Sequence, residues 1–432
     1  MSPSIFLDFN LPNAATWFYF SLLLTVALFF QYYRPLALRN FDLLALFLFV
    51  PGFLFLQEKG GTENRLAGYV WLLAASGFWF VRCLVDTVVT RRPVSSPNLN
   101  TPGLVWFCMA ILICLTAVAY RRPAEPKDQA GKQPAVVAGM EKGAAAVIGQ
   151  ANVAEAPRDQ VQFFASRSIA ILCHVLIATG LFLIGWKHFA DGPTGVAAAT
   201  LYLLLPYTAI QVDKVHHVWP AALLVWAVLL FRRHSTAGWL AGIAAGSTFF
   251  PVLLLPVWIQ FYRGRGLDRF LIAFGCATAV GVGLTVLALW ATGDASGAVW
   301  QSASIADWQP WRTPKSESAW TGVHAAYRLP VFVVYVGFVL ATLTWPPARD
   351  LGQFVAVAAA VMIGVQFWFA DRGGVYVLWY LPLLIVLVLR PNTTDLQPRP
   401  PDPRRGLFGR VAAVVGRRTK VWERPEPKQV AV

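Results

Sequence analysis

The sequence predicts an all-α polytopic membrane protein, with about 11–13 helices that each cross the bilayer. Hydrophobic residues make up 57% of the 432 positions and charged residues only 13%, whereas a soluble domain carries about 25% charged residues. So few charges cannot cover a water-exposed surface of this size. Apolar runs of roughly 17–25 residues recur along the chain, which is the length of a membrane-spanning helix and differs from the alternating pattern of a barrel strand.

The formal net charge of +14 does not indicate a nucleic-acid partner. The basic residues lie in short corners between apolar runs and in the tail 390–432, which has ten Lys/Arg and four Asp/Glu. Such a distribution orients the spans against an anionic inner leaflet. We therefore expect a multi-pass protein of the plasma (inner) membrane, in contact with membrane lipids, whose basic C-terminal tail is cytoplasmic. The five cysteines lie in apolar stretches without a Cys-x-x-Cys pair and are expected to be small core residues.

The first 102 residues are predicted to form an N-terminal three-span unit. Residues 1–13 lack basic residues, so the first span is expected to stay as an uncleaved anchor. In the third span Arg82 and Asp86 are four residues apart and share a helix face. They are either a satisfied ion pair near the span end or part of a polar site. The spans are predicted at 15–33, 41–56 and 66–89.

A core unit is predicted at 103–292, with an outward loop at 121–165. The apolar run 237–262 has basic clusters at both ends and is interrupted by Pro251 and Pro256. A single crossing would place the clusters on opposite sides, so a hairpin of two short helices turning near 249–251 is favoured. The remaining spans of this unit are predicted at 104–120, 168–186, 195–212, 218–231 and 270–292.

A tryptophan-rich connector at 293–328 precedes a C-terminal unit of three spans at 329–389. These spans are predicted at 329–345, 351–370 and 375–389. Counting back from a cytoplasmic tail, and including the hairpin, the connectors 121–162 and 293–328 face outward together with the corner 213–217. The three most polar segments would then share one side and could build one site.

Several short motifs follow one another in the core unit. They are Arg167-Ser168 at the start of a span, Gly192-Pro193-Thr194-Gly195 with Ala197-Ala198-Ala199, Leu205-Pro206-Tyr207, and Arg232-Arg233 followed by a stretch from Ala237 to Gly246 and by Pro251. Together these motifs resemble the GT-C superfamily of membrane glycosyltransferases, and most closely its dolichyl-phosphate-mannose and aminoarabinose transferase-like branches and its polyprenol-phosphate-mannose-dependent mannosyltransferases. The resemblance covers roughly 167–291 and implies a GT-C-like core.

This resemblance implies sugar transfer from a polyprenyl-phosphate donor to a glycan or lipid acceptor at the outer face. The family places a catalytic carboxylate in the first outward loop, where it acts as general base on the acceptor hydroxyl. The nearest equivalent here is Glu141, which lacks the family's neighbouring aromatic residue; Asp159, Asp128 and Glu155 are the alternative candidates in that region. The departing phosphate must be stabilised by cations or by a metal, so a divalent metal is the one candidate cofactor.

Other residues of the outward segments are candidates for substrate binding. Arg167, Lys214 and Arg328 lie at outward span ends and could bind phosphate, or simply reach the membrane interface. The cluster Asp213, His216 and His217 could bind a divalent metal, contact a sugar or provide interfacial polarity. The last group lies in the tryptophan-rich connector and consists of Trp308, Trp311, Arg312 and Lys315. These residues could stack on a sugar and contact phosphate, or they could belong to the aromatic belt of a membrane protein.

Two other classes of protein remain open from the sequence. A polytopic transporter or lipid flippase would show two related halves and ionisable residues in the middle of its spans. The chain has no convincing internal repeat and few mid-span charges beyond Arg82 and Asp86. A catalytically silent relative that serves as a membrane scaffold is the third alternative.

Overall fold

The computed structural model describes residues 13–57, 62–88, 97–123, 158–290, 310–311, 319–320, 323–346, 348–369 and 376–398. Within these ranges the regular structure is entirely helical. The elements are α1 (Ala14–Phe29), α2 (Leu38–Ala45), α3 (Val50–Gln57), α4 (Thr62–Asp86), α5 (Thr101–Arg121), α7 (Arg158–His188), α8 (Gly192–Leu204), α9 (Pro206–Ile210), α10 (Val215–Leu229), α11 (His234–Ser247), the 3₁₀ helix η1 (Phe250–Leu254), α12 (Leu255–Tyr262), α13 (Leu267–Trp290), α15 (Ala325–Ala341), α16 (Leu351–Trp368) and α17 (Val377–Leu389).

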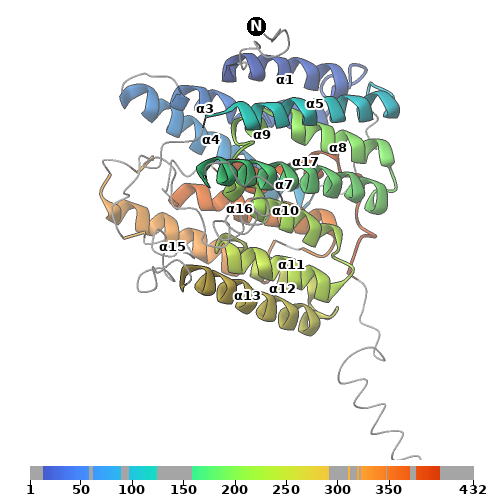
Figure 1. Ribbon diagram of the computed structural model, residues 1–432. Helices are drawn as coiled ribbons and strands as arrows, with labels where there is room; N and C mark the ends of the chain where they lie inside the picture. The colour runs from blue at the N-terminus through green and yellow to red at the C-terminus, as the bar shows by residue number, and fades with distance from the viewer. Residues whose placement is uncertain are drawn as a thin grey trace, which may run out of the picture.

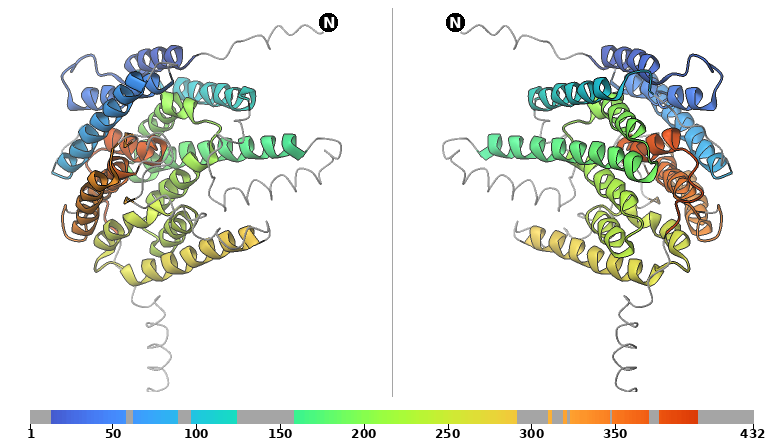
Figure 2. Two further views of the ribbon diagram at one scale, coloured as in Figure 1. Left: turned by 90° about the vertical axis from the view of Figure 1, so that its left-hand side faces the viewer. Right: turned by 90° about the vertical axis from the view of Figure 1, so that its right-hand side faces the viewer.

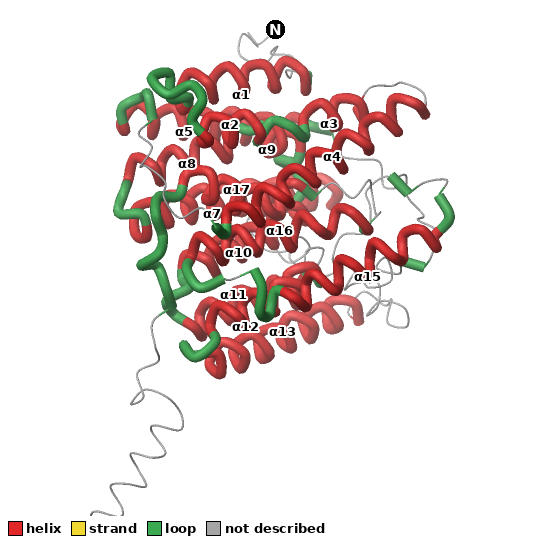
Figure 3. Tube along the Cα trace, turned by 180° about the vertical axis from the view of Figure 1, so that it is seen from behind, coloured by secondary structure: helices red, strands yellow, loops and turns green. Residues whose placement is uncertain are grey.

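The helices lie roughly side by side, with α1 and α13 at opposite edges of the bundle and α16, α17 and α10 between them (Figures 1 and 2). Seen from behind, α4 runs beside α16, and α15 lies on the other side of α16 (Figure 3). α16 and α17 are almost completely buried and form the centre of the core. We name the two ends of the bundle by one residue each: the Asp213 end, where α10 begins, and the Arg390 end, where α17 ends.

The described residues confirm a helical protein with spans suited to a membrane. Six helical segments are long and apolar enough to cross a bilayer. Six shorter apolar helices accompany them, and the total number of crossings stays a prediction. The six long segments are Leu38–Gln57, Arg65–Asp86, Thr101–Arg121, Phe163–His188, Leu267–Leu284 and Leu351–Trp368.

One predicted span, 195–212, is divided by a proline. Leu205 precedes Pro206 and has an extended backbone, with φ −60° and ψ 139°, because the proline ring disfavours a helical conformation in the residue before it. Helix α8 therefore ends at Leu204, and the short helix α9 carries the chain onward to Ile210. This break directs the following turn, which contains Asp213, into the bundle rather than along a helix axis.

The predicted hairpin is present. α11 ends at Ser247, and the chain turns through Thr248 and Phe249 into η1 and α12. The hydroxyl of Tyr262, at the end of α12, donates to the carbonyl of Phe231, 2.7 Å away, just before α11. The two basic clusters that flank the hairpin therefore lie at the same end of the bundle, the Arg390 end.

The glycine-rich motifs are contacts between helices. Gly242 of α11 packs on α13 so closely that a Cβ atom there would lie 2.5 Å from the carbonyl oxygen of Phe274, and Gly238 and Gly246 are similarly close to α13. Gly185 of α7 and Gly195 of α8 form a second such contact, with no room for a Cβ atom on either. Small residues at this spacing let helix backbones approach, which is a common way to pack helices inside a membrane.

A chain of buried ion pairs holds the Arg390 end together. Arg82 binds both carboxylate oxygens of Asp42 at 2.8 Å and donates to Asp86 at 3.0 Å. Asp86 also accepts from Arg390, whose Nη2 lies 2.6 Å from Oδ2. All four side chains are at most 8% exposed. This Asp42–Arg82–Asp86–Arg390 ion chain confirms the predicted Arg82–Asp86 pair and extends it to two partners that sequence spacing did not indicate.

Substitution of the central carboxylate tests the ion chain. Asp86→Asn leaves Arg390 and Arg82 buried with one carboxylate fewer, and the loss should lower the free energy of unfolding by about 3 kcal/mol or more. Thermal unfolding of the purified protein in detergent measures it. The matched control is Asp268→Asn, an exposed acid in the first turn of α13, expected to cost less than about 1 kcal/mol. Equal shifts for both variants would contradict the proposed role of the ion chain.

The close packing at Gly242 predicts that alanine substitutions at Gly242 and at Gly275 change the stability of the fold in opposite directions. Gly242→Ala adds a Cβ atom where the backbone of α13 leaves no space, so it should destabilise the fold by about 1–3 kcal/mol. Gly275→Ala, on α13 itself, places its Cβ atom in open space and should stabilise the helix by up to about 1 kcal/mol. The unfolding temperatures of the two variants and of the wild type, measured under one condition, test this prediction. An increase for Gly242→Ala would be inconsistent with the close packing.

Candidate functional site

Asp213 is the centre of a buried charge cluster at the Asp213 end. It lies in the turn between α9 and α10, and Lys214 is the residue before the first turn of α10. Its carboxylate accepts from Arg122, with Nη1 3.1 Å from Oδ1, and from Arg167, with Nη1 2.5 Å from Oδ2. The Asp213 side chain is only 5% exposed. One carboxylate therefore holds two guanidinium groups, and the cluster has an excess of positive charge.

The two arginines come from neighbouring helices and are exposed to different degrees. Arg122 follows the last residue of α5 and also donates to the carbonyl of Ile210; its side chain is 29% exposed, against 8% for Arg167. Arg167 lies in α7 over the ring of Phe163, 4.9 Å from its centroid. Its Nε is buried and has no hydrogen-bond acceptor in the described part of the chain. Arg122 is thus the group of this cluster most open to a ligand.

An aromatic wall leads away from the cluster. The rings of His216 and His217 are 4.3 Å apart, and His217 lies 5.3 Å from Tyr376. Tyr376 stacks on Trp379 at 4.0 Å, and the Trp379 Nε1 donates to the carbonyl of His216 at 3.3 Å. Phe250, at the hairpin turn, packs on Trp379 at 4.2 Å. These residues come from α10, η1 and α17, so the wall joins three elements that are distant in sequence.

Arg328 is bound to the end of α16. It is in the first turns of α15 and only 2% exposed. Its Nε donates to the carbonyl of Trp368 at 2.6 Å, at the end of α16, and the nearby Trp320 Nε1 donates to the carbonyl of Phe367 at 3.1 Å. The start of α15 is thereby fixed to the end of α16, at the same end of the bundle as Asp213.

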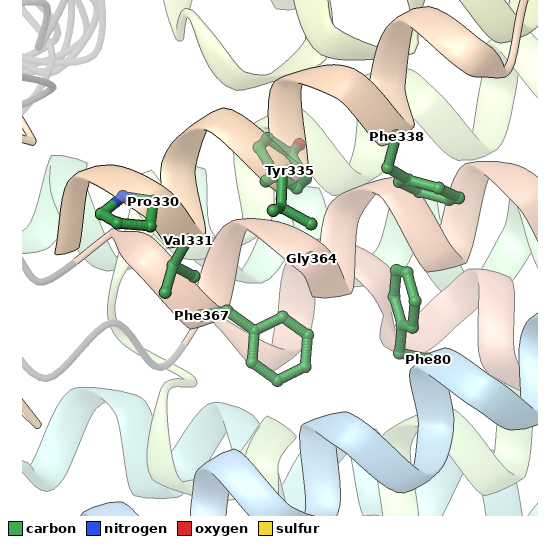
Figure 4. A pocket seen from close by; sticks show the side chains of 8 residues that line it. Phe80, Pro330, Val331, Tyr335, Phe338, Gly364 and Phe367 are labelled. Atoms are coloured by element: carbon green, nitrogen blue, oxygen red, sulfur yellow. The ribbon is translucent and has the colours of Figure 1, made fainter. Parts of the chain in front are cut away.

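An apolar groove runs beside α15, between α4 and α15, with α16 as its floor (Figure 4). Its volume is about 350 Å³. Pro330 and Val331 line it within one turn of Arg328, and Phe80 and Phe338 line its other end. Every residue that lines the groove is apolar or aromatic, as expected for a surface that contacts hydrocarbon chains.

The structure brings together part of the predicted site. Arg167 and Asp213 are in direct contact, with Lys214, His216 and His217 beside them, and Arg328 is at the same end. Trp311 is 62% exposed. Within the described residues no group of three or more His, Cys, Asp or Glu side chains lies close enough to hold a metal ion. The backbone of Asp159 is in the first turn of α7. The other predicted site residues lie outside the described ranges: Glu141, Asp128, Glu155, Trp308, Arg312 and Lys315.

Sequence reasoning missed Arg122, Tyr376 and Trp379. Arg122 is the second residue after the predicted span 104–120, so its position at the same outward end as Arg167 was available as a signal. Tyr376 and Trp379 lie inside or beside the last span, where an aromatic residue ordinarily belongs to the core or the membrane interface. Only the contact between α17 and α10 identifies them as part of this wall.

Comparison with known proteins adds no identity: no family model, no curated protein and no solved structure matches the chain.

The unequal exposure of the two arginines makes a prediction for double-mutant cycles. The buried pair Arg167–Asp213 should show a coupling energy of about 2 kcal/mol or more, because an uncompensated charge would be left in a dry site. The partly exposed pair Arg122–Asp213 should show less than about 1 kcal/mol. Unfolding of Arg167→Gln, Arg122→Gln, Asp213→Asn and the two double variants measures both couplings. Equal couplings would show that the two arginines are equally solvated.

Proposed function

We propose that the protein is a membrane glycosyltransferase with a GT-C-like core, which transfers a sugar from a polyprenyl-phosphate donor to a glycan or lipid acceptor. The observation that supports this most directly is the position of the Arg122–Asp213–Arg167 cluster. It lies where the connector after α5 begins, at the same end of the bundle as the attachments of the second long connector, to α13 and α15. The catalysis would take place at the outer face of the inner membrane.

The charge cluster suits the phosphate of such a donor. Both oxygens of Asp213 are already used by arginines, so Asp213 is better suited to hold the guanidinium groups than to remove a proton. Arginine binds phosphate through paired hydrogen bonds, and the exposed part of Arg122 supplies free donor directions. Stabilising the departing phosphate is the electrostatic task of this reaction.

The apolar groove suits the lipid part of the donor. It reaches along α15 from Pro330, two residues after Arg328, to Phe338 (Figure 4). A polyprenyl chain has no polar atoms to satisfy, so a groove lined entirely by apolar side chains removes its surface from water or competes with lipid at no polar cost. The general base remains Glu141 in this proposal, with Asp159 and Asp128 as alternatives, because Asp213 is engaged.

Transfer of labelled sugar in reconstituted vesicles tests the proposal. Glu141→Gln should lower kcat by about 10²- to 10⁴-fold, since it removes the general base. Arg122→Gln should act chiefly on KM for the donor, by about tenfold, as one charge-assisted hydrogen bond is lost. Glu125→Gln, in the same connector, is the matched control and should retain wild-type turnover.

Three results would count against this function. Full turnover in Glu141→Gln, Asp159→Asn and Asp128→Asn alike would remove the predicted base. Movement of the labelled lipid across the bilayer without sugar transfer would favour a flippase. Absence of both transfer and movement with every polyprenyl-phosphate sugar would favour a silent membrane scaffold.

A further inference from the structure

A second polar pocket lies at the Arg390 end, far from the cluster at Asp213. It has a volume of about 320 Å³ and is formed by two turns: the one after α12 and the one between α15 and α16. Three arginines line it: Arg263, Arg265 and Arg349. The pocket is therefore strongly basic, and none of the residues that line it is acidic.

The turn after α12 holds two of these arginines in fixed positions. Gly264 and Gly266 have φ of +71° and +94°, a conformation that side-chain-bearing residues rarely adopt. The turn closes through a hydrogen bond of 2.8 Å from the amide of Arg265 to the carbonyl of Tyr262, and Gly266 packs against the ring of His234. Arg263 and Arg265 therefore extend from an ordered turn.

The second turn brings the third arginine to the same place. Nη1 of Arg265 donates to the backbone carbonyl of Arg349 at 3.3 Å, which joins the two turns. The amide of Arg349 donates to the side chain of Gln353 at 3.1 Å. Arg349 thus lines the pocket together with Arg263 and Arg265.

The charges of this pocket are not balanced within the described part of the chain. Arg263 and Arg349 are exposed and Arg265 is partly buried, and none of the three forms an ion pair with a described acid.

The adjacent acid, Asp350, is buried and does not line the pocket. Asp350 accepts from the amide of Gln353 and from the hydroxyl of Thr393, each at 3.0 Å. Since guanidinium groups stay protonated, three positive charges line one pocket and attract an anion to it.

Two further polar groups and two apolar ones define what anion fits. Gln260 has a buried Oε1 without a hydrogen-bond donor among the described residues, and Thr344 contributes a hydroxyl group. Phe261 and Leu343 supply apolar walls. An anion that also carries hydroxyl donors and an apolar portion would use all of these groups, which a simple inorganic ion would not.

The pocket lies at the rim of the apolar bundle. On the α15–α16 corner Trp345 is 64% exposed, and Leu340, in the last turn of α15, is 57% exposed. Exposed tryptophan at the end of an apolar helix is typical of the level of lipid headgroups. A phosphate bound by the three arginines would therefore be at headgroup depth, with hydrocarbon beside it.

We propose that this pocket binds a phosphate ester, and that its natural source is the headgroup of an anionic glycerophospholipid in the leaflet at the Arg390 end. The arginines bind the phosphodiester oxygens through charge-assisted hydrogen bonds. A headgroup hydroxyl donates to Oε1 of Gln260, and the acyl chains extend along α15. This site is separate from the proposed donor site and does not depend on sugar transfer.

Lipid retention by the purified full-length protein tests the site. The probes are phosphatidylglycerol, phosphatidylcholine and soluble glycerol 1-phosphate, each titrated into delipidated protein in detergent and detected by native mass spectrometry. Wild-type protein should retain phosphatidylglycerol at least about tenfold more tightly than phosphatidylcholine. The variant Arg263→Gln/Arg265→Gln/Arg349→Gln should lose that preference.

The matched control removes the same charge from the same end. It is Arg34→Gln/Lys187→Gln/Arg233→Gln, three exposed cations that do not line the pocket, and it should retain the preference within about twofold of wild type, because exposed charges that do not share one binding pocket act weakly on a bound phosphate. A single variant, Gln260→Leu, provides a second readout that leaves the net charge unchanged. It should weaken the binding of phosphatidylglycerol, while the unfolding temperature of the variant stays close to that of the wild-type protein.

The outcomes distinguish a lipid headgroup from a soluble phosphate ester, and a specific site from bulk attraction to anionic lipid. Glycerol 1-phosphate that binds as tightly as phosphatidylglycerol would assign the pocket to a soluble phosphate ester and overturn the lipid source. Equal loss of preference in the pocket variant and the control would mean bulk attraction of basic residues to anionic lipid and would overturn the site. No loss in the pocket variant, with both proteins folded by circular dichroism, would overturn it as well.

Discussion

The buried Asp42–Arg82–Asp86–Arg390 ion chain is the interaction on which the arrangement of this bundle depends. Its members come from α2, α4 and the residue after α17, so it joins the first part of the chain to the last. A charge in an apolar interior is tolerated only when it is paired and hydrogen-bonded. The alternation of carboxylate and guanidinium groups meets that requirement for all four residues at once, and it also restricts how α4 and α17 can be placed relative to each other.

Close helix packing supplies the second constraint. The small residues of α11 on α13, and of α7 on α8, remove the space that a side chain would need. In a membrane there is no hydrophobic driving force between apolar helices, so contact area and fit decide which helices pair. Gly195, and Gly238, Gly242 and Gly246 of the stretch 237–246, make these contacts, so their direct role is to pack helices against one another.

The two ends of the bundle differ in how the charges of their arginines are compensated by acids. At the Asp213 end a single carboxylate holds two arginines, and one of these remains partly exposed. At the Arg390 end the ion chain is balanced, whereas the pocket beside it has three arginines without an acid among the lining residues. Both unbalanced sites point to phosphate as a ligand, one beside an apolar groove and one at the rim of the bundle. The same physical property, uncompensated guanidinium charge next to hydrocarbon, underlies both proposals.

Local composition and spacing determined much of the architecture. Apolar runs fixed the helices, Pro206 and Pro251 marked the breaks, and the basic clusters around 237–262 predicted the hairpin, because each of these depends on a few neighbouring residues. The four-residue spacing predicted the Arg82–Asp86 pair for the same reason. Tertiary packing decided the contacts between residues that are distant in the sequence. It brought Asp42 and Arg390 into one ion chain, and it brought Arg167 and Arg122 to Asp213. It also placed Tyr376 and Trp379 beside His217. Helix-to-helix contacts depend on the fit of whole surfaces, and no local pattern in one chain encodes which surfaces meet.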